Sequence, residues 1–282
     1  MSYSRKKRLY TVIYHMLVCV FGVVMIYPLL WMVMSSFKDT ADIFKNSDLL
    51  WPKVFKISNY AAGWKGFGGI SFAVFFRNSF AICIFATIGT VISSAIIAFG
   101  FSRCNFKFRN VWFGCMLVSM MMPFQIIMIP QFIIFKKLGW VGTFAPLIIP
   151  YFFGLPFGIF LIMQFIRGIP KDLDEAAKID GCSIYGIFAK IILPLIVPAM
   201  VTTAIFSFMW RWDDFLASLL YLNTPSMYPV SLALKMFSDP SAQSDWGSMF
   251  AMASLSLIPI FVVFITMQKY LVEGISTTGM KG

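Results

Sequence analysis

Residues 175–181 (Glu-Ala-Ala-Lys-Ile-Asp-Gly) form a short polar segment between long apolar stretches, and their types and spacing suit a docking element. Pro170 fits the first turn of a helix, where its missing N–H needs no partner. The acidic side chains within residues 172–175 complement the positive end of the helix dipole. Gly181 can adopt the left-handed conformation that ends a helix, and Ser183 can cap a second helix. The pattern predicts a rigid helix–turn–helix whose small alanine side chains let another surface approach closely.

A second charged group lies late in an apolar stretch, at residues 211–215 (Arg-Trp-Asp-Asp-Phe). Arg211 and Asp214 are three residues apart and can pair on one helix face. A helix starting at Pro198 would rise about 20 Å before Arg211, so the group is expected in the outer part of a membrane. Ionisable residues at such depth usually face a protein interior or a watery cavity and mark function. The alternative is that the helix has already left the bilayer and these residues are interfacial anchors.

Catalytic patterns are scarce in the sequence. His15 is the only histidine, which excludes a His-Glu-x-x-His zinc site and argues against a histidine-based hydrolase. The five cysteines form no Cys-x-x-Cys pair, and no Gly-x-x-x-x-Gly-Lys-Ser/Thr loop for nucleotide phosphates occurs. We therefore expect no enzyme activity, catalytic residue, metal site or cofactor in this chain.

The composition is that of a membrane protein. The 282 residues are 59% hydrophobic and 12% charged, with a mean hydropathy of +0.81, which is too apolar for a soluble domain of this size. Six stretches can each supply the roughly 20 residues of a membrane-spanning helix. We expect a single all-α, polytopic transmembrane domain over residues 1–282, with spans at 9–34, 78–102, 110–135, 142–166, 195–220 and 248–269.

The charge distribution orients these spans. Lysine and arginine cluster before the first span, in alternate connections and after the last span, so the net charge of +11 indicates a membrane topology rather than a nucleic-acid partner. The positive-inside rule makes residues 1–8, 167–194 and 270–282 cytoplasmic and residues 223–246 external. The adjacent lysines Lys136 and Lys137 are an exception to this pattern.

Small residues recur four apart in the second expected span, at Gly89 and Ser93 and at Ser94 and Ala98. Such spacing lets helices approach closely in lipid, where packing rather than the hydrophobic effect drives association. We therefore expect neighbouring helices to pack tightly on this span.

Prolines cluster in the third and fourth expected spans. Pro123 and Pro130 flank Gln125, and three more prolines lie within residues 146–156. A proline frees a backbone carbonyl and bends the helix, and transporters use such breaks to build polar sites and hinges. A kinked packing helix is the alternative for any single proline. The clustering favours a gated pathway.

Residues 175–181 and Leu193-Pro194 resemble the EAA loop of the membrane subunits of bacterial ABC importers. A generic solvated connector would rarely reproduce the glutamate, both alanines, the glycine and the leucine-proline in register. Further segments resemble the carbohydrate-uptake branch, similar to the MalG subunit of the maltose importer: Asn78-Ser79, Ala98 to Arg103, Met122-Pro123, Ile129-Pro130, Ile169-Pro170 and Gly274 to Gly282. The resemblance covers essentially the whole chain. It implies a type I ABC importer (MetI-like) fold with six transmembrane helices and cytoplasmic termini in the bacterial inner membrane.

The resemblance also implies roles for particular residues. Those implied to couple to an ATPase are Glu175, Ala176, Ala177, Asp180, Gly181, Leu193 and Pro194. Those implied to lie in a tail along the ATPase interface are Gly274, Gly279, Lys281 and Gly282. Those expected to line or gate the pathway are Pro123, Gln125, Arg211, Trp212, Asp213, Asp214 and Phe215. Those implied to face a solute-binding protein are Tyr228, Asp245, Trp246 and Gly247.

The partners implied are a second permease subunit, an ATPase dimer holding ATP and magnesium, an extracellular or periplasmic solute-binding protein, a sugar and membrane lipid. The sequence departs from the family pattern at Asp213, where asparagine is usual, and Arg211 adds a charge. An ABC permease for another solute, such as glycerol phosphate, is therefore an alternative. A stand-alone secondary carrier is less consistent with a chain that lacks a charge-rich central span. An intramembrane enzyme lacks a convincing nucleophile and base.

Overall fold

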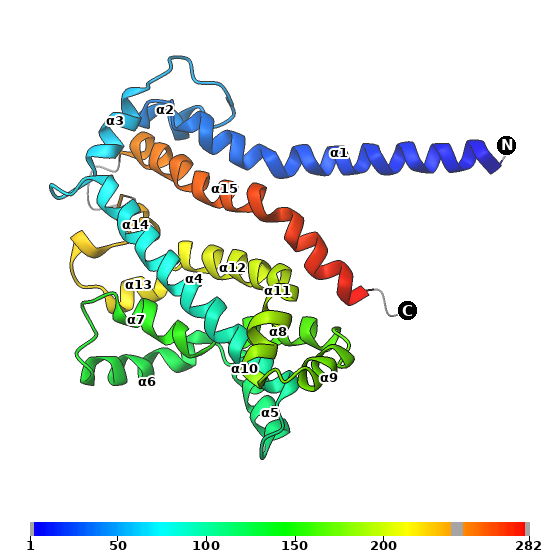
Figure 1. Cartoon of the computed structure of the whole chain (residues 1–282). Coiled ribbons are helices and arrows are strands. Elements are labelled where there is room, and N and C mark those ends of the chain that lie inside the picture. Colours follow the sequence, from blue (N-terminus) through cyan, green and yellow to red (C-terminus); the bar gives the residue numbers. More distant parts are fainter. Residues whose placement is uncertain (1–2, 238–244, 280–282) are drawn as a thin grey trace. The chain divides into compact units, whose positions relative to one another are not determined.

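A computed structural model describes residues 3–237 and 245–279 of the chain, and side chains over residues 10–237 and 245–270. These residues form helices joined by loops (Figure 1). The α-helices are α1 (Tyr3–Ser35), α2 (Thr40–Lys45), α3 (Ser58–Lys65), α4 (Phe72–Arg103), α5 (Arg109–Met120), α6 (Phe124–Lys137), α7 (Ala145–Ile148), α8 (Pro156–Arg167), α9 (Asp172–Ile179), α10 (Ile184–Ile187), α11 (Leu193–Leu195), α12 (Val197–Trp212), α13 (Leu216–Tyr221), α14 (Val230–Phe237) and α15 (Trp246–Gly279). Two 3-10 helices, η1 (Ile149–Phe153) and η3 (Pro225–Met227), and a π-helix, η2 (Phe188–Ile192), complete the described set.

Among the described residues, four continuous stretches are long and apolar enough to cross a membrane: Tyr10–Ser35, Phe72–Arg103, Ala145–Arg167 and Trp246–Tyr270. Two further candidates are bent helix pairs. Arg109–Met120 and Phe124–Lys137 meet at 104°, and Ile184–Leu195 and Val197–Trp212 meet at 72°. Counting each bent pair as one span gives six, the number expected from the sequence.

Prolines account for both bends. Pro123 has an extended backbone with ψ of 141° and directly precedes α6. Proline disfavours a helical conformation in the residue before it and cannot donate a backbone hydrogen bond, so α5 ends at Met120. The second bend lies at Ile196, between Pro194 and Pro198.

The chain divides into two compact units. Unit 1 comprises Met1–Phe72 and Leu234–Leu257. In this unit the buried Asn59 side chain donates to the backbone oxygens of Ser36 and Lys38, at 2.9 and 2.8 Å. The span of α1 from Tyr10 onward has no buried residue in its most apolar part, and the helix projects away from α2 and α3 (Figure 1).

Unit 2 comprises Ala73–Ala233 and Ile258–Gly282. Its largest core joins α4, α8, the α9–α10 region and α12. A Cβ atom at Gly158 of α8 would lie 2.8 Å from both Ser94 Oγ of α4 and Thr203 Cγ2 of α12. The predicted close packing on the small residues of α4 is therefore confirmed.

Candidate functional site

The α9 helix ends in the glycine turn that the sequence predicts. Cys182 N–H donates to Ala177 O at 2.8 Å, and Gly181 N–H donates to Lys178 O at 3.0 Å. These two bonds define a Schellman motif, which satisfies carbonyls that the helix end would leave free. Gly181 has φ of +78°, a conformation that other residues rarely adopt.

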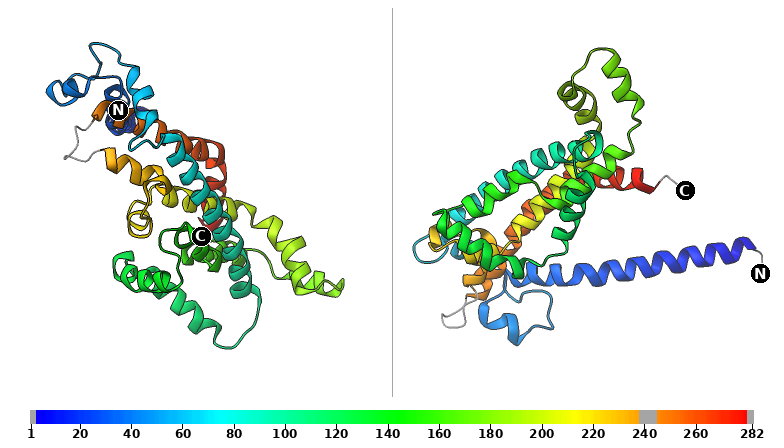
Figure 2. Two further views of the ribbon diagram at one scale, coloured as in Figure 1. Left: turned by 90° about the vertical axis from the view of Figure 1, so that its left-hand side faces the viewer. Right: turned by 90° about the horizontal axis from the view of Figure 1, so that it is seen from below.

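The chain turns directly into a second helical stretch. Ser183 Oγ accepts a hydrogen bond from Gly186 N–H at 3.2 Å and so caps α10, as predicted. The helical path continues through η2 and α11 to Leu195, with Ile187 and Ile192 buried in the unit 2 core. Leu193 is half-buried and Pro194 is exposed. The α9–α10 hairpin thus projects from unit 2 on a fixed base (Figure 2).

The two faces of α9 differ in character. Asp174 and Ala177 face the core, whereas Glu175, Ala176 and Asp180 are exposed. Exposed apolar side chains accompany them: Ile179 is 86% exposed and Tyr185 of α10 is 82% exposed. Exposed apolar side chains that lie together can form a contact surface, so this face suits a protein partner. The sequence interpretation overlooked Ile179, although it lies one turn after Glu175 on the same face.

A buried ion pair anchors the base of α9, and the sequence interpretation missed it. Arg103 Nε, at the end of α4, lies 2.9 Å from Asp174 Oδ2, and the two side chains are only 5% and 11% exposed. Arg103 also donates to Ile169 O at 2.7 Å. No local spacing could reveal this contact, because the two residues lie far apart in the sequence.

The second predicted group forms its expected ion pair. Arg211 Nη1 lies 2.9 Å from Asp214 Oδ2. Arg211 also hydrogen-bonds to the hydroxyl of Tyr151 and lies 4.6 Å from the centre of its ring. Asp214 Oδ1 accepts a hydrogen bond from Ala217 N–H, in the first turn of α13, at 3.1 Å. The pair therefore ties the end of α12 to its neighbours in unit 2.

The other residues assigned to the pathway occupy different environments. Trp212 is 3% exposed and its ring stacks on Phe208 at 5.6 Å, so it is part of a core cluster. Asp213 is exposed and Phe215 half-buried.

Pro123 and Gln125 are exposed at the break before α6. Among the contacts that the structure describes, none joins them to the Arg211–Asp214 pair. Within the described contacts, the residues assigned to a pathway therefore lie in separate environments.

The residues assigned to a binding-protein surface fall into two places. Tyr228 lies in unit 2, where its backbone oxygen accepts from the Asn78 side chain at 3.1 Å. Asp245 lies in unit 1, next to the first residue of α15. Its Oδ1 accepts from Ser248 N–H at 3.2 Å and from Thr40 Oγ1 at 2.9 Å. Burial raises the pKa of Asp245, but the hydrogen bonds from Ser248 and Thr40 outweigh burial, so its pKa lies below the ordinary value.

Trp246 and Gly247 are also held by contacts within unit 1. The Trp246 ring meets the Phe44 ring edge-on at 5.2 Å. A Cβ atom at Gly247 would lie 2.5 Å from Asn59 Nδ2, so only glycine fits there without rearrangement. These residues shape the start of α15, whatever else they contact.

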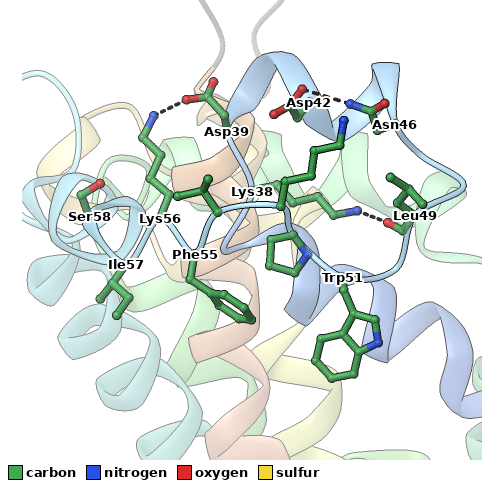
Figure 3. A pocket seen from close by; sticks show the side chains of 13 residues that line it. Lys38, Asp39, Asp42, Asn46, Leu49, Trp51, Phe55, Lys56, Ile57 and Ser58 are labelled. Atoms are coloured by element: carbon green, nitrogen blue, oxygen red, sulfur yellow. Dashed lines mark hydrogen bonds and ion pairs between the residues drawn. The ribbon is translucent and has the colours of Figure 1, made fainter.

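A cavity of about 350 Å³ lies beside this region in unit 1, within the connection that follows α1 (Figure 3). Lys56 Nζ pairs with Asp39 Oδ2 at 2.7 Å, and Lys38 Nζ donates to Leu49 O at 2.5 Å. The bond from Lys56 is the main reason that the pKa of Asp39 lies below its ordinary value. Burial lowers the pKa of Lys38 although nearby carboxylates raise it. One ion pair and hydrogen bonds to neutral groups thus hold most of the charged side chains around the cavity.

The predicted tail lies mostly at the limit of the described residues. The backbone of α15 continues through Gly274 to Gly279, so the helix is longer than the expected span at 248–269. Lys281 and Gly282 lie outside the described residues.

Comparison with known proteins identifies the family. Residues 89–277 match the model of the "Binding-protein-dependent transport system inner membrane component". The chain belongs to this family. It is 37% identical to the probable ABC transporter permease protein YurM of Bacillus subtilis over 91% of this chain and 84% of that protein. It is 30% identical to the arabinooligosaccharides transport system permease protein AraQ of Halalkalibacterium halodurans over 91% of each.

A solved structure supports the same fold for the permease. The chain matches part of a bacterial ABC transporter involved in the import of the acidic polysaccharide alginate, with a TM-score of 0.78 and 23% identity over 96% of this chain and 99% of that one. The expected all-α, MetI-like fold of type I ABC importers is confirmed. The permease is a multi-pass protein of the bacterial inner membrane.

Proposed function

We propose that this permease subunit forms part of an importer that carries sugars or oligosaccharides into the cell. Support comes from the names of similar proteins, which include an arabinooligosaccharide permease and a transporter for alginate. The permease would work with a second permease subunit, an ATPase dimer and an external solute-binding protein. ATP and magnesium would be held by the ATPase, and a sugar would reach the permease from the binding protein.

The α9–α10 hairpin is the observation that carries this proposal. It presents Glu175, Ala176, Ile179 and Tyr185 outward, while Asp174 fixes its base to α4. A flexible loop would absorb the motion of a partner, whereas a capped hairpin on a buried ion pair can pass that motion on. The geometry suits a lever that moves with an ATPase.

These contacts support the following proposed mechanism. Closure of the ATPase dimer on ATP would carry Glu175, Ala176 and Gly181 with it. The Arg103–Asp174 pair and the core around Ile187 and Ile192 would transmit this motion to α4 and α8. Rearrangement of these helices would alternate access to the pathway, which is the usual mode of such transporters.

Two other regions have proposed roles in the same cycle. The Arg211–Asp214 pair, with Asp213 exposed beside it, would lie next to the pathway near the outer face. Tyr228 and the residues at the start of α15 would form part of the surface toward the binding protein. The tail from Gly274 onward would extend along the ATPase.

Coupling can be tested in the reconstituted importer with Glu175→Lys and Gly181→Trp. Each is expected to abolish transport and the ATP hydrolysis stimulated by loaded binding protein, while the complex still reaches the membrane. Matched controls are Asp48→Lys and Gly68→Trp. Gly68 also has a positive φ, +58°, and a Cβ added there would have no atom within 4 Å, so Gly68→Trp reports the effect of backbone strain alone. Retained transport in both α9–α10 variants would refute the role of this hairpin.

The substrate class needs a separate measurement. The cognate binding protein should gain thermal stability with an oligosaccharide in a panel that also contains monosaccharides and glycerol phosphate. A shift with glycerol phosphate alone would favour the second candidate, a permease for a non-sugar solute. Transport by the purified chain alone, without any ATPase, would instead indicate a secondary carrier.

A further inference from the structure

A cavity of about 480 Å³ opens in unit 2 beside the base of α9. It lies where the end of α4, the start of α5, the end of α8 and the segment before α9 meet, and these elements are neighbours in Figure 1. Four cationic side chains line it: Arg103, Arg109, Arg167 and Lys171. Nothing in the coupling mechanism accounts for this concentration of positive charge.

The charge is largely uncompensated. Asp174 neutralises Arg103, and no carboxylate lines the cavity. Among the described residues, the Arg109 guanidinium makes only long contacts to neutral oxygens, at 3.4 Å to Cys104 O and 3.5 Å to Asn105 Oδ1. The Arg167 guanidinium lies 5.4 Å from the ring centre of Phe113 and makes no hydrogen bond or ion pair among the described residues. Like charges gathered in one cavity without a counter-charge favour binding of an anion.

The surroundings place this cavity at the surface of the bilayer. Arg103 and Arg167 are the last residues of two apolar stretches long enough to cross the membrane. Large apolar side chains are exposed close by, on the connection after α4 and on the first turns of α5: Phe106, Phe108, Val111 and Trp112. Aromatic residues beside cationic ones are typical of the membrane–water interface. The positive-inside rule assigns this interface to the cytoplasmic leaflet.

We propose that the cavity binds the phosphate headgroup of an anionic phospholipid from the inner leaflet. Arg109 and Arg167 would provide planar pairs of N–H donors suited to phosphate oxygens, and Lys171 a point charge. The acyl chains would lie along the exposed apolar residues of α5. Basic pockets between membrane helices on the cytoplasmic side are known to suit such headgroups.

The position gives the lipid a consequence for the hairpin. The cavity is bounded by residues 168–171, which lead directly into α9, and by Arg103, which holds Asp174. A bound phosphate would reduce the repulsion among the cations at this point. An occupied cavity therefore holds the base of the hairpin more firmly than an empty one.

The test compares two double variants of the whole importer in nanodiscs made with phosphatidylcholine alone or with added phosphatidylglycerol. Arg109→Gln with Arg167→Gln removes two cavity charges. Lys190→Gln with Lys269→Gln removes two charges outside the cavity and is the matched control. Native mass spectrometry measures how much phosphatidylglycerol stays on the permease, a readout that does not depend on transport.

The native importer and the control are expected to retain phosphatidylglycerol, and the cavity variant to bind it roughly 30-fold more weakly. Each cation near an anionic membrane contributes about 1 kcal/mol to binding, so removing two cations costs about 2 kcal/mol. Because about 1.4 kcal/mol corresponds to a tenfold change in affinity, this loss is roughly 30-fold. Competition by soluble inorganic phosphate at equal strength would overturn the lipid assignment in favour of a free anion. Equal retention by both variants would overturn the proposal. The proposal would also be overturned if the cavity variant retained phosphatidylglycerol but lost the ATPase. In that case the cations would bind carboxylates of the ATPase instead of a lipid.

Discussion

The contact between Arg103 and Asp174 shows how one pair of residues can fix a mechanical element. Taking both charges out of water is costly, and their attraction offsets that cost only with good geometry and extra hydrogen bonds. Here the ion-pair separation is 2.9 Å and Arg103 donates a hydrogen bond to Ile169 O, but Arg103 Nε and Asp174 Oδ1 have no hydrogen-bond partner among the described residues. Such a pair contributes more to orientation than to net stability. It holds α9 in one position against α4.

Removing one charge of the pair should therefore lower the free energy of unfolding by much more than the pair as a whole contributes to it. We expect Asp174→Asn to destabilise the permease by about 3–5 kcal/mol, because it leaves a buried guanidinium without its counter-charge. Unfolding in mixed detergent micelles measures this loss. Asp172→Asn is the matched control in the same helical turn, and as an exposed change it should stay within about 0.5 kcal/mol. Equal stability of the two variants would contradict the inferred burial of the pair.

The two ion pairs of unit 2 show which side-chain contacts a sequence can reveal. Arg211 and Asp214 are three residues apart, so helical geometry alone predicted their pairing. Arg103 and Asp174 belong to different helices, and their charges had separate local explanations in membrane orientation and helix capping. Only the packing of α4 against the α9 region brings them together. The exposed Ile179 was missed for a related reason, since burial depends on neighbours that the sequence does not specify.

Asp245 allows a pH-dependent test of a helix cap. Its native pKa lies below the ordinary 3.8. The stability that the Asp245 carboxylate contributes is therefore fully present at pH values above the ordinary pKa. This contribution is lost as the pH falls below the ordinary pKa and through the native pKa. We expect Asp245→Ala to cost about 0.5–2 kcal/mol at neutral pH, since α15 loses its cap, and Asp245→Asn to cost less.

The readout is the thermal midpoint of the native protein and both variants from neutral pH to about pH 3. The difference in thermal midpoint between the native protein and Asp245→Asn should become smaller as the pH falls, because asparagine carries no titrating charge. A gap that stays constant with pH would show that the carboxylate charge contributes nothing at this site.

At the scale of elements, prolines and glycines predicted where helices stop but not how sharply they turn. The break at Pro123 and the turn at Gly181 were both expected from the residue types. The bend of 104° between α5 and α6 was not, because its size depends on what each half packs against. Likewise, the prolines within residues 146–156 produce α7, η1 and α8 within one apolar stretch. The apolar stretches and the turn at Gly181 were predictable, whereas the short helices between them and the angles needed tertiary contacts.

The crossing of α4, α8 and α12 depends on the absence of a side chain at Gly158. We expect Gly158→Ala to destabilise the permease by about 1–3 kcal/mol, since its new methyl group must displace Ser94 or Thr203 in a close-packed core. Gly100→Ala in α4 is the matched control, because its Cβ would meet no atom within 4 Å. That change should instead stabilise the helix by about 0.5–1 kcal/mol. Unfolding of both variants in detergent distinguishes a packing effect from a helix-propensity effect. A helix-propensity effect would change the free energy of unfolding in the same direction at both positions.

At the scale of the whole molecule, the distribution of cations determines how the chain is oriented in the membrane. Lys107 lies among cations in one connection, whereas Lys53 lies in a connection where nearby aspartates dilute the positive charge. The positive-inside rule places the first inside and the second outside. Lys136 opposes the rule, because it belongs to a connection expected outside. The many charges in the other loops should dominate over this one exception.

Cysteine labelling can decide this orientation in the intact importer. Lys53→Cys, Lys107→Cys and Lys136→Cys would be introduced singly into a variant without its five native cysteines. A membrane-impermeant maleimide should label positions 53 and 136 from outside the cell, and position 107 only in inverted vesicles. Labelling of position 136 from the cytoplasmic side would mean that the bent α5–α6 pair does not cross the bilayer. It would then be a re-entrant element, and the permease would have fewer spans than its apolar stretches suggest.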